Sequence, residues 1–148
     1  MEEDRLNTLL AYTRAKSLAV NCAKTACLFP EYERYALADQ LRRAAYSTVL
    51  NVAEGASRAT LPQRRHFLDI ARASVREVRV IIDLAADIGY LDTEVAKELQ
   101  EECHLAAKTI FGYHRSICEK IDAGKRLHRA AVTASCIVAA TTLYLLVL

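Results

Sequence analysis

The chain has few of the residues that interrupt helices. Its 148 residues include four Gly and two Pro, no Trp, and 7% aromatic residues. Ala and Leu are abundant, and both lose little conformational entropy in a helix. The four glycines are isolated from one another, which excludes a glycine-rich loop for binding phosphate groups. Composition therefore predicts an all-α protein with the length of one domain.

A strong excess of charge of one sign is also missing. The net charge is +2, from 20 Lys and Arg against 18 Asp and Glu. Three of the basic residues, Lys125, Arg126 and Arg129, follow residue 124 and no acidic residue does, so residues 1–124 are nearly neutral. Proteins that bind nucleic acid mainly through phosphates usually have a basic body. The charge balance argues against bulk electrostatic binding of RNA or DNA and leaves a local basic patch open.

Paired cysteines are absent as well. The chain has an odd number of cysteines and no Cys-x-x-Cys motif; they are Cys22, Cys27, Cys103, Cys118 and Cys136. The first four residues, Met-Glu-Glu-Asp, are acidic and do not resemble a signal or transit peptide. Both features predict a reducing, cytoplasmic setting, in which buried cysteines act as small hydrophobic residues.

Helix breakers divide the chain at regular intervals. Pro30, Pro62, Gly89 and Gly124 separate four long segments, which are residues 4–28, 31–57, 62–88 and 93–123. Thr60 is placed to cap the third segment, with Pro62 in its first turn and Gly89 after its last. Four helices joined by short loops predict an up-down-up-down four-helix bundle.

The third segment has the clearest helical period. One face is predicted to be buried: Phe67, Ile70, Ala71, Ser74, Val78, Ile81, Ala85 and Ile88. The opposite face is charged: Arg65, Asp69, Arg72, Arg76, Arg79 and Asp83. The second segment is predicted to bury Leu37, Leu41, Ala45, Thr48, Val52 and Ala56 in the same manner.

The last nineteen residues, Ala130 to Leu148, carry no charge. As a helix they would span about 28 Å, close to the ~30 Å of a bilayer core. Lys125, Arg126 and Arg129 form a basic collar that would face the cytoplasm. We therefore predict an additional C-terminal transmembrane helix, with residues 125–148 forming a unit separate from the bundle of 1–124; the alternative is a fifth helix packed in a soluble oligomer. We assign tail packing to Ala131, Ser135, Ala139, Leu143, Tyr144 and Leu145.

The second and third segments carry a longer pattern. It reads Phe29-Pro30, Glu33, Tyr35, Leu37, Gln40, Arg42-Arg43-Ala44, Ser47, Asn51, Ala53-Glu54-Gly55, Arg58, Phe67, Leu68, Ile70-Ala71, Ser74, Glu77 and Gly89-Tyr90-Leu91. The pattern resembles that of the bacterial four helix bundle protein family, known from open reading frames in 23S rRNA intervening sequences. The resemblance covers about residues 5–122, so the tail is additional to it.

The resemblance implies a four-helix bundle, assembly as a ring-like homopentamer, and no established enzymatic activity. The family is similar in fold to the accessory protein of diversity-generating retroelements, which binds nucleic acid and a reverse transcriptase. A likeness of fold alone transfers function weakly.

Arginines are the candidate nucleic-acid contacts. Arg42, Arg43, Arg58, Arg64 and Arg65 are predicted to gather near the link between the second and third segments. Arg72, Arg76 and Arg79 extend a basic stripe along the third segment, and guanidinium groups bind phosphate through two parallel hydrogen bonds. The alternative is a solvated face of i,i+4 ion pairs such as Arg65–Asp69 and Arg79–Asp83.

Other polar positions have weaker claims. Asn51, Glu54, Gly55 and Arg58 indicate either a polar site or subunit contact at the bundle tip, or a helix end at which Gly55 allows close packing. Glu101-x-x-His104 lacks the second motif that a di-metal bundle requires, and His114 and Cys118 lack further ligands. We therefore predict no metal, no cofactor and no catalytic residue.

Two functions remain. The first is a non-enzymatic, homo-oligomeric scaffold or effector, anchored in the bacterial inner membrane by its tail, with a cytoplasmic body. The alternative is a cytoplasmic, RNA-binding accessory protein that binds nucleic acid, or an enzyme acting on it, through the arginines.

Overall fold

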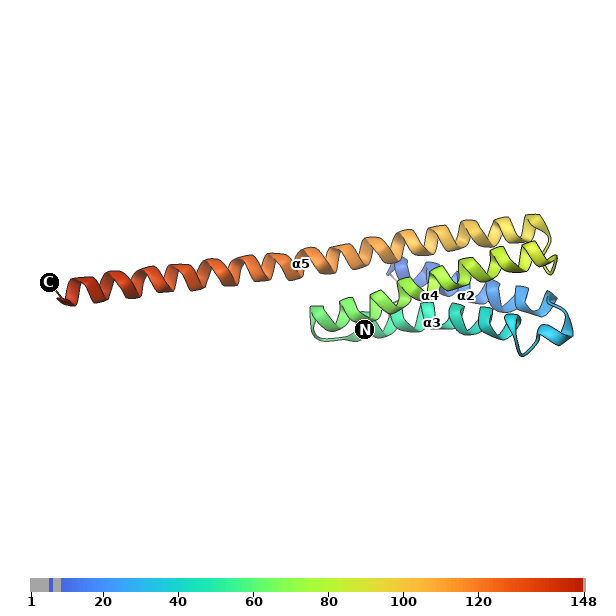
Figure 1. Cartoon of the computed structure of the whole chain (residues 1–148), viewed down its shortest axis with the longest axis horizontal. Coiled ribbons are helices and arrows are strands. Elements are labelled where there is room, and N and C mark those ends of the chain that lie inside the picture. Colours follow the sequence, from blue (N-terminus) through green and yellow to red (C-terminus); the bar gives the residue numbers. More distant parts are fainter. Residues whose placement is uncertain (1–5, 7–8, 148) are drawn as a thin grey trace.

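A computed structural model describes residue 6 and residues 9–147, and for residues 136–147 it describes the backbone alone. The helices are α2 (Leu10–Thr25), α3 (Leu37–Ser57), α4 (Leu61–Ile88) and α5 (Thr93–Val147). Two short 3₁₀ turns, η1 (Ala26–Leu28) and η2 (Glu31–Glu33), join α2 to α3. Figure 1 shows α2, α3, α4 and the first half of α5 side by side. The predicted all-α four-helix bundle is confirmed for the described residues.

The ends of α4 follow from its local sequence, as predicted. The Thr60 hydroxyl accepts a hydrogen bond from the Gln63 backbone N–H at 3.4 Å, and a proline stands in the first turn. At the other end Gly89 has φ 86°, the left-handed conformation that favours glycine. Asp92 precedes α5, which begins at Thr93 as expected.

Helix α3 begins six residues later than predicted, at Leu37 instead of Glu31. A Glu33 carboxylate oxygen accepts a hydrogen bond from the Leu37 backbone N–H at 3.0 Å and so caps the helix. The Tyr90 hydroxyl donates to the other oxygen of that carboxylate at 3.1 Å. The α2–α3 link is therefore fastened to the turn between α4 and α5.

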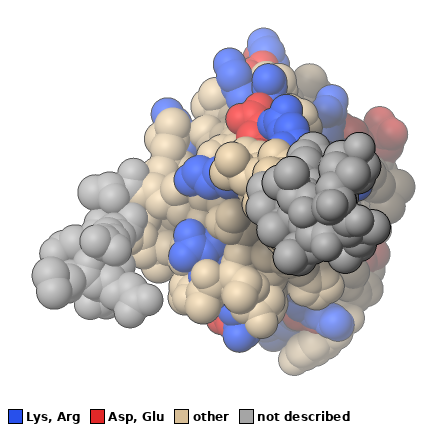
Figure 2. Space-filling model, turned by 90° about the vertical axis from the view of Figure 1, so that its left-hand side faces the viewer, with Lys and Arg blue, Asp and Glu red and all other residues tan. Residues whose placement is uncertain are grey.

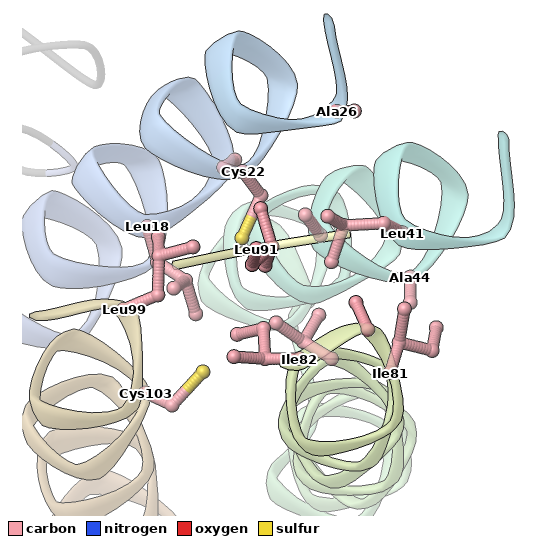
Figure 3. Close-up of a cluster of buried hydrophobic side chains, with 14 of the residues drawn as sticks. Leu18, Cys22, Ala26, Leu41, Ala44, Ile81, Ile82, Leu91, Leu99 and Cys103 are labelled. Atoms are coloured by element: carbon pink, nitrogen blue, oxygen red, sulfur yellow. The ribbon is translucent and has the colours of Figure 1, made fainter. Parts of the chain in front are cut away.

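All four helices contribute to the core. Figure 3 shows Leu18 and Cys22 of α2 and Leu99 and Cys103 of α5 in one cluster, which Leu41 of α3 and Ile82 of α4 join from the other two helices. Burial raises the pKa of the Cys103 thiol to about 12, so this thiol stays protonated and packs as an apolar group.

The buried face of α4 is partly as predicted. Ala71, Ser74, Val78, Ile81 and Ala85 are buried. Ile70 and Ile88 are exposed instead, and Leu68, Val75 and Ile82 take their places in the core. Because α4 packs against both α3 and α5, its buried arc turns toward α5, which the sequence period does not reveal.

The turn between α3 and α4 depends on Gly55. A Cβ atom at this position would lie 3.3 Å from the Arg64 carbonyl oxygen and 3.3 Å from the Phe67 Cβ. Neither atom belongs to the free end of a flexible side chain. The interpretation of Gly55 as a close-packing residue fits this geometry.

Helix α5 does not end near Ala123, so that predicted boundary is wrong. It continues through Gly124 as far as Val147, and Figure 1 shows this extension projecting beyond the other helices. Glycine lowers the stability of a helix interior by about 1 kcal/mol but does not by itself end it. The division into residues 1–124 and 125–148 stays a prediction.

The predicted transmembrane helix is contradicted. Across the part of the chain that the structure describes, no helix combines the length and the apolar character needed to cross a membrane. The membrane-anchor interpretation is wrong on this finding.

Gly55→Ala is expected to destabilise the bundle by about 1 kcal/mol, because crowding of the α3–α4 contact outweighs the gain in helix propensity. Gly112→Ala is the matched control, since a Cβ at Gly112 meets no atom within 4 Å. It should stabilise the protein by up to about 1 kcal/mol. Urea unfolding followed by circular dichroism measures both; equal shifts in the two variants would contradict the close-packing role.

Candidate nucleic-acid interface

The arginine stripe of α4 borders α5. Gln100 of α5 donates to the Arg79 carbonyl oxygen at 3.0 Å and also to Asp83. Further along, the Arg72 guanidinium lies 5.4 Å from the centre of the Phe111 ring of α5. These contacts define a seam between α4 and α5, which we call the α4–α5 seam. The stripe runs along its outer edge.

The predicted ion pairs do not neutralise this stripe. Asp69 contacts Arg72 at 3.5 Å and His114 at 2.9 Å, rather than Arg65. Asp83 accepts from Gln100, rather than pairing with Arg79. Among the described residues, no salt bridge joins Arg65, Arg76 or Arg79 to a carboxylate, and all three residues are exposed. These three guanidinium groups are free to bind an anion.

Arg42 and Arg43 do not gather with Arg58. Arg58 follows Arg42 by sixteen positions, at the end of the continuous helix α3, which places them about 24 Å apart along the helix. Arg42 donates to the Arg34 carbonyl oxygen at 2.8 Å and lies 3.6 Å from Asp39. Arg43 is exposed on the same end of α3. The predicted five-arginine cluster is therefore two separate groups.

The arginines at the α3–α4 turn hold the turn together. Arg58 pairs with Glu54, and its guanidinium stacks 4.7 Å from the centre of the Phe67 ring. Arg64 donates from Nε to the Arg58 carbonyl oxygen at 2.7 Å. Asn51 donates to the Ser47 carbonyl oxygen at 2.8 Å. Their side-chain hydrogen bonds are thus used locally, which fits the interpretation of this region as a helix terminus.

The basic collar continues the seam. Lys125, Arg126 and Arg129 are exposed on α5 beyond the end of α4. Lys125 and Arg129 follow Phe111 and Cys118 at helical spacing, so they lie on the side of α5 that faces the seam. Figure 2 looks at this end of the molecule, where more Lys and Arg than Asp and Glu side chains are visible. The collar and stripe together form an interrupted basic track.

The tail residues divide into two sets. Ala131 and Ser135 are exposed on α5. The side chains of Ala139, Leu143, Tyr144 and Leu145 lie outside the described part of the chain. Glu101 and His104 are both exposed, and no group of three or more possible metal-ligating side chains gathers among the described residues.

Sequence reasoning missed two features of the seam. Phe111 supports Arg72 from the neighbouring helix, and Asp69 holds His114 instead of Arg65. The two contacts join α4 to α5 between residues 39 and 45 positions apart in the chain, so no local spacing could have revealed them.

Comparison with known proteins identifies related chains. Residues 7–112 match the model of the 23S rRNA-intervening sequence protein family. No curated protein matches. A crystal structure from Bacteroides thetaiotaomicron, described as a protein of unknown function from the S23 ribosomal protein family, has a TM-score of 0.66 and 15% identity. The match covers 70% of this chain and 97% of that one, and at this identity it shows the fold alone.

Arg58→Ala is expected to destabilise the protein by about 1 kcal/mol, because the Phe67 stacking and the Glu54 pair are both lost. Arg76→Ala removes an exposed arginine that has no carboxylate partner among the described residues, and it should change stability by less than about 0.5 kcal/mol. Thermal unfolding of the two variants measures their stability and so shows whether Arg58 supports the fold while Arg76 does not. Equal destabilisation would mean that Arg76 also supports the fold.

Proposed function

The chain belongs to the 23S rRNA-intervening sequence protein family, and on this premise we propose that it binds RNA without catalysing a reaction. The observation that carries the proposal is the trio of exposed arginines Arg65, Arg76 and Arg79, which have no carboxylate partner among the described residues. An RNA partner would place the protein in the cytoplasm, the alternative location predicted from the sequence.

The stripe suits phosphate contacts. Arg65 and Arg79 are fourteen residues apart on one straight helix, which is about 21 Å. Guanidinium groups fixed along one helix edge bind the backbone of a nucleic acid and do not read its bases. Lys125 and Arg129 add two further cations near the Arg65 end of the track.

The near-neutral body limits the strength of this binding. Five cations, three on α4 and two on α5, would give a slope of about −3.5 in a plot of log K against log salt for single-stranded RNA. We therefore propose a salt-sensitive contact, in which the fixed positions of the cations on α4 and α5 select RNA by the shape of its phosphate backbone. Arg72 is less available, because Asp69 and Phe111 hold its guanidinium.

The triple variant Arg65→Glu/Arg76→Glu/Arg79→Glu should weaken binding to a 23S rRNA hairpin by more than tenfold and reduce the salt slope by about 2 to 3. Fluorescence anisotropy across a salt series measures both. The matched control is Arg14→Glu/Lys16→Glu/Lys24→Glu, which makes the same charge change on exposed positions of α2. Equal losses of RNA affinity in the two variants would show only a non-specific effect of charge, and would contradict the proposal that RNA binds along the basic track.

We also propose that the chain forms a homo-oligomer through the outer face of α3 and α4. Large apolar side chains are exposed there: Tyr46, Leu50, Ile70, Val80, Leu84 and Ile88. An apolar face of this extent is typical of a surface that meets another protein. The pentameric number that the family resemblance implies is part of this proposal.

Leu84→Glu is expected to reduce the assembly to single chains, because it places a charge within that apolar face. Leu105→Glu, on an exposed position of α5, is the control and should leave the mass unchanged. Light scattering after size-exclusion chromatography gives the mass. An unmodified chain that is already monomeric at micromolar concentration would contradict the proposal.

A further inference from the structure

A cysteine, a histidine and an aspartate meet across the α4–α5 seam. His114 Nε2 lies 2.9 Å from the Asp69 carboxylate oxygen Oδ1. The Cys118 Sγ lies 3.8 Å from each of the two ring nitrogens of His114. The His114 side chain is 13% exposed, and Cys118 is half-buried. The proposed RNA contact uses none of these three side chains.

The arrangement is that of a thiol nucleophile with a base and a group that holds the base in place. Asp69 accepts a hydrogen bond from the Nε2–H, which leaves Nδ1 as the ring nitrogen with a free lone pair. The thiol is as close to Nε2 as to Nδ1, so it is not in line with the Nδ1 lone pair, and the Cys118 side chain and the imidazole ring must turn before the S–H bond points at Nδ1. Catalytic hydrogen bonds commonly tighten in this way when a reactant binds.

The register of the two helices places one cation of α4, Arg65, opposite the thiol. Because Asp69 lies opposite His114 and the helices are antiparallel, Arg65 lies opposite Cys118 in the same register. Arg65 is exposed and has no carboxylate partner among the described residues, and Arg72 flanks Asp69. On α5, Glu119 pairs with Arg115. An anionic reagent would therefore be drawn toward this thiol.

We propose that Cys118 is a site of thiol–disulfide exchange with small anionic disulfides, with His114 as the base and Asp69 as its positioning residue. His114 Nδ1 takes the thiol proton, and the Cys118 thiolate attacks one sulfur of the reagent. A new S–S bond forms at Cys118 as the reagent's own S–S bond breaks. The departing thiolate takes the proton from His114, so one disulfide replaces another and no further oxidant is needed.

The chain supplies internal controls for this reaction. Cys27 is exposed, and its thiol donates only to the Ala23 carbonyl oxygen, at 3.5 Å. It therefore reports the reactivity of an accessible thiol that no base assists. Cys22 and Cys103 are 0% and 1% exposed and report whether the bundle stays folded.

The test treats the full chain, without RNA, with glutathione disulfide, which is anionic, or cystamine, which is cationic. Mass spectrometry of peptides follows each cysteine separately. Glutathione disulfide should modify Cys118 at least tenfold faster than Cys27, and cystamine should show a smaller ratio. His114→Gln should lower the Cys118 rate to that of Cys27, and Asp69→Asn should give an intermediate rate.

Equal rates at Cys118 and Cys27, or a Cys118 rate that His114→Gln leaves unchanged, would overturn the proposal. Modification of Cys22 and Cys103 would reveal an unfolded variant. If a variant is unfolded, Arg65→Gln provides the test instead, because it should lower the modification rate of Cys118 with glutathione disulfide and not with cystamine. An equal loss of rate with both reagents would overturn the preference for anionic disulfides. These rates do not depend on whether the protein binds RNA, so the two proposals fail separately.

Discussion

The close approach of α3 to α4 is the constraint on which the other surfaces depend. Gly55 lets the two helices meet at their shared turn, and the Ser47 and Ser74 hydroxyls hydrogen-bond at 2.8 Å further along. Small residues at a helix contact bring the two backbones near each other and fix their relative rotation. That rotation determines which side of α4 faces α5, and so where the arginine stripe and the α4–α5 seam lie.

One helix therefore serves three environments. The buried arc of α4 packs in the core, the Ile70–Ile88 side forms an apolar outer face with α3, and the arginine side borders α5. Separation of these chemistries around one helix explains how a nearly neutral chain can still present a local basic track. It also keeps the proposed RNA contact away from the proposed contact between subunits.

The sequence predicted correctly those features that depend on interactions between residues close together in the chain, such as the ends of α4. Thr60, Pro62 and Gly89 act within a turn of their own positions, so the ends of α4 were readable from the sequence. Gly124 misled because an isolated glycine costs a helix about 1 kcal/mol without ending it. The position of Arg42 far from Arg58, and the pairing of Asp69 with His114, depend on helix length and register. The tail suggested a membrane helix because it carries no charge, but absence of charge does not by itself give the apolar character that a membrane-spanning helix needs.

Because α5 continues without interruption through Gly124, a small change in helix direction at this residue moves the C-terminal end of the helix over a larger distance. From Gly124 to Val147 the helix is about 35 Å long, and nothing interrupts its backbone hydrogen-bonded path. A bend of about 5° at the glycine would move the far end by about 3 Å. Small changes of helix direction near the bundle are thus magnified at the C-terminal end of the helix, and Gly124 is the position at which the helix can bend most easily.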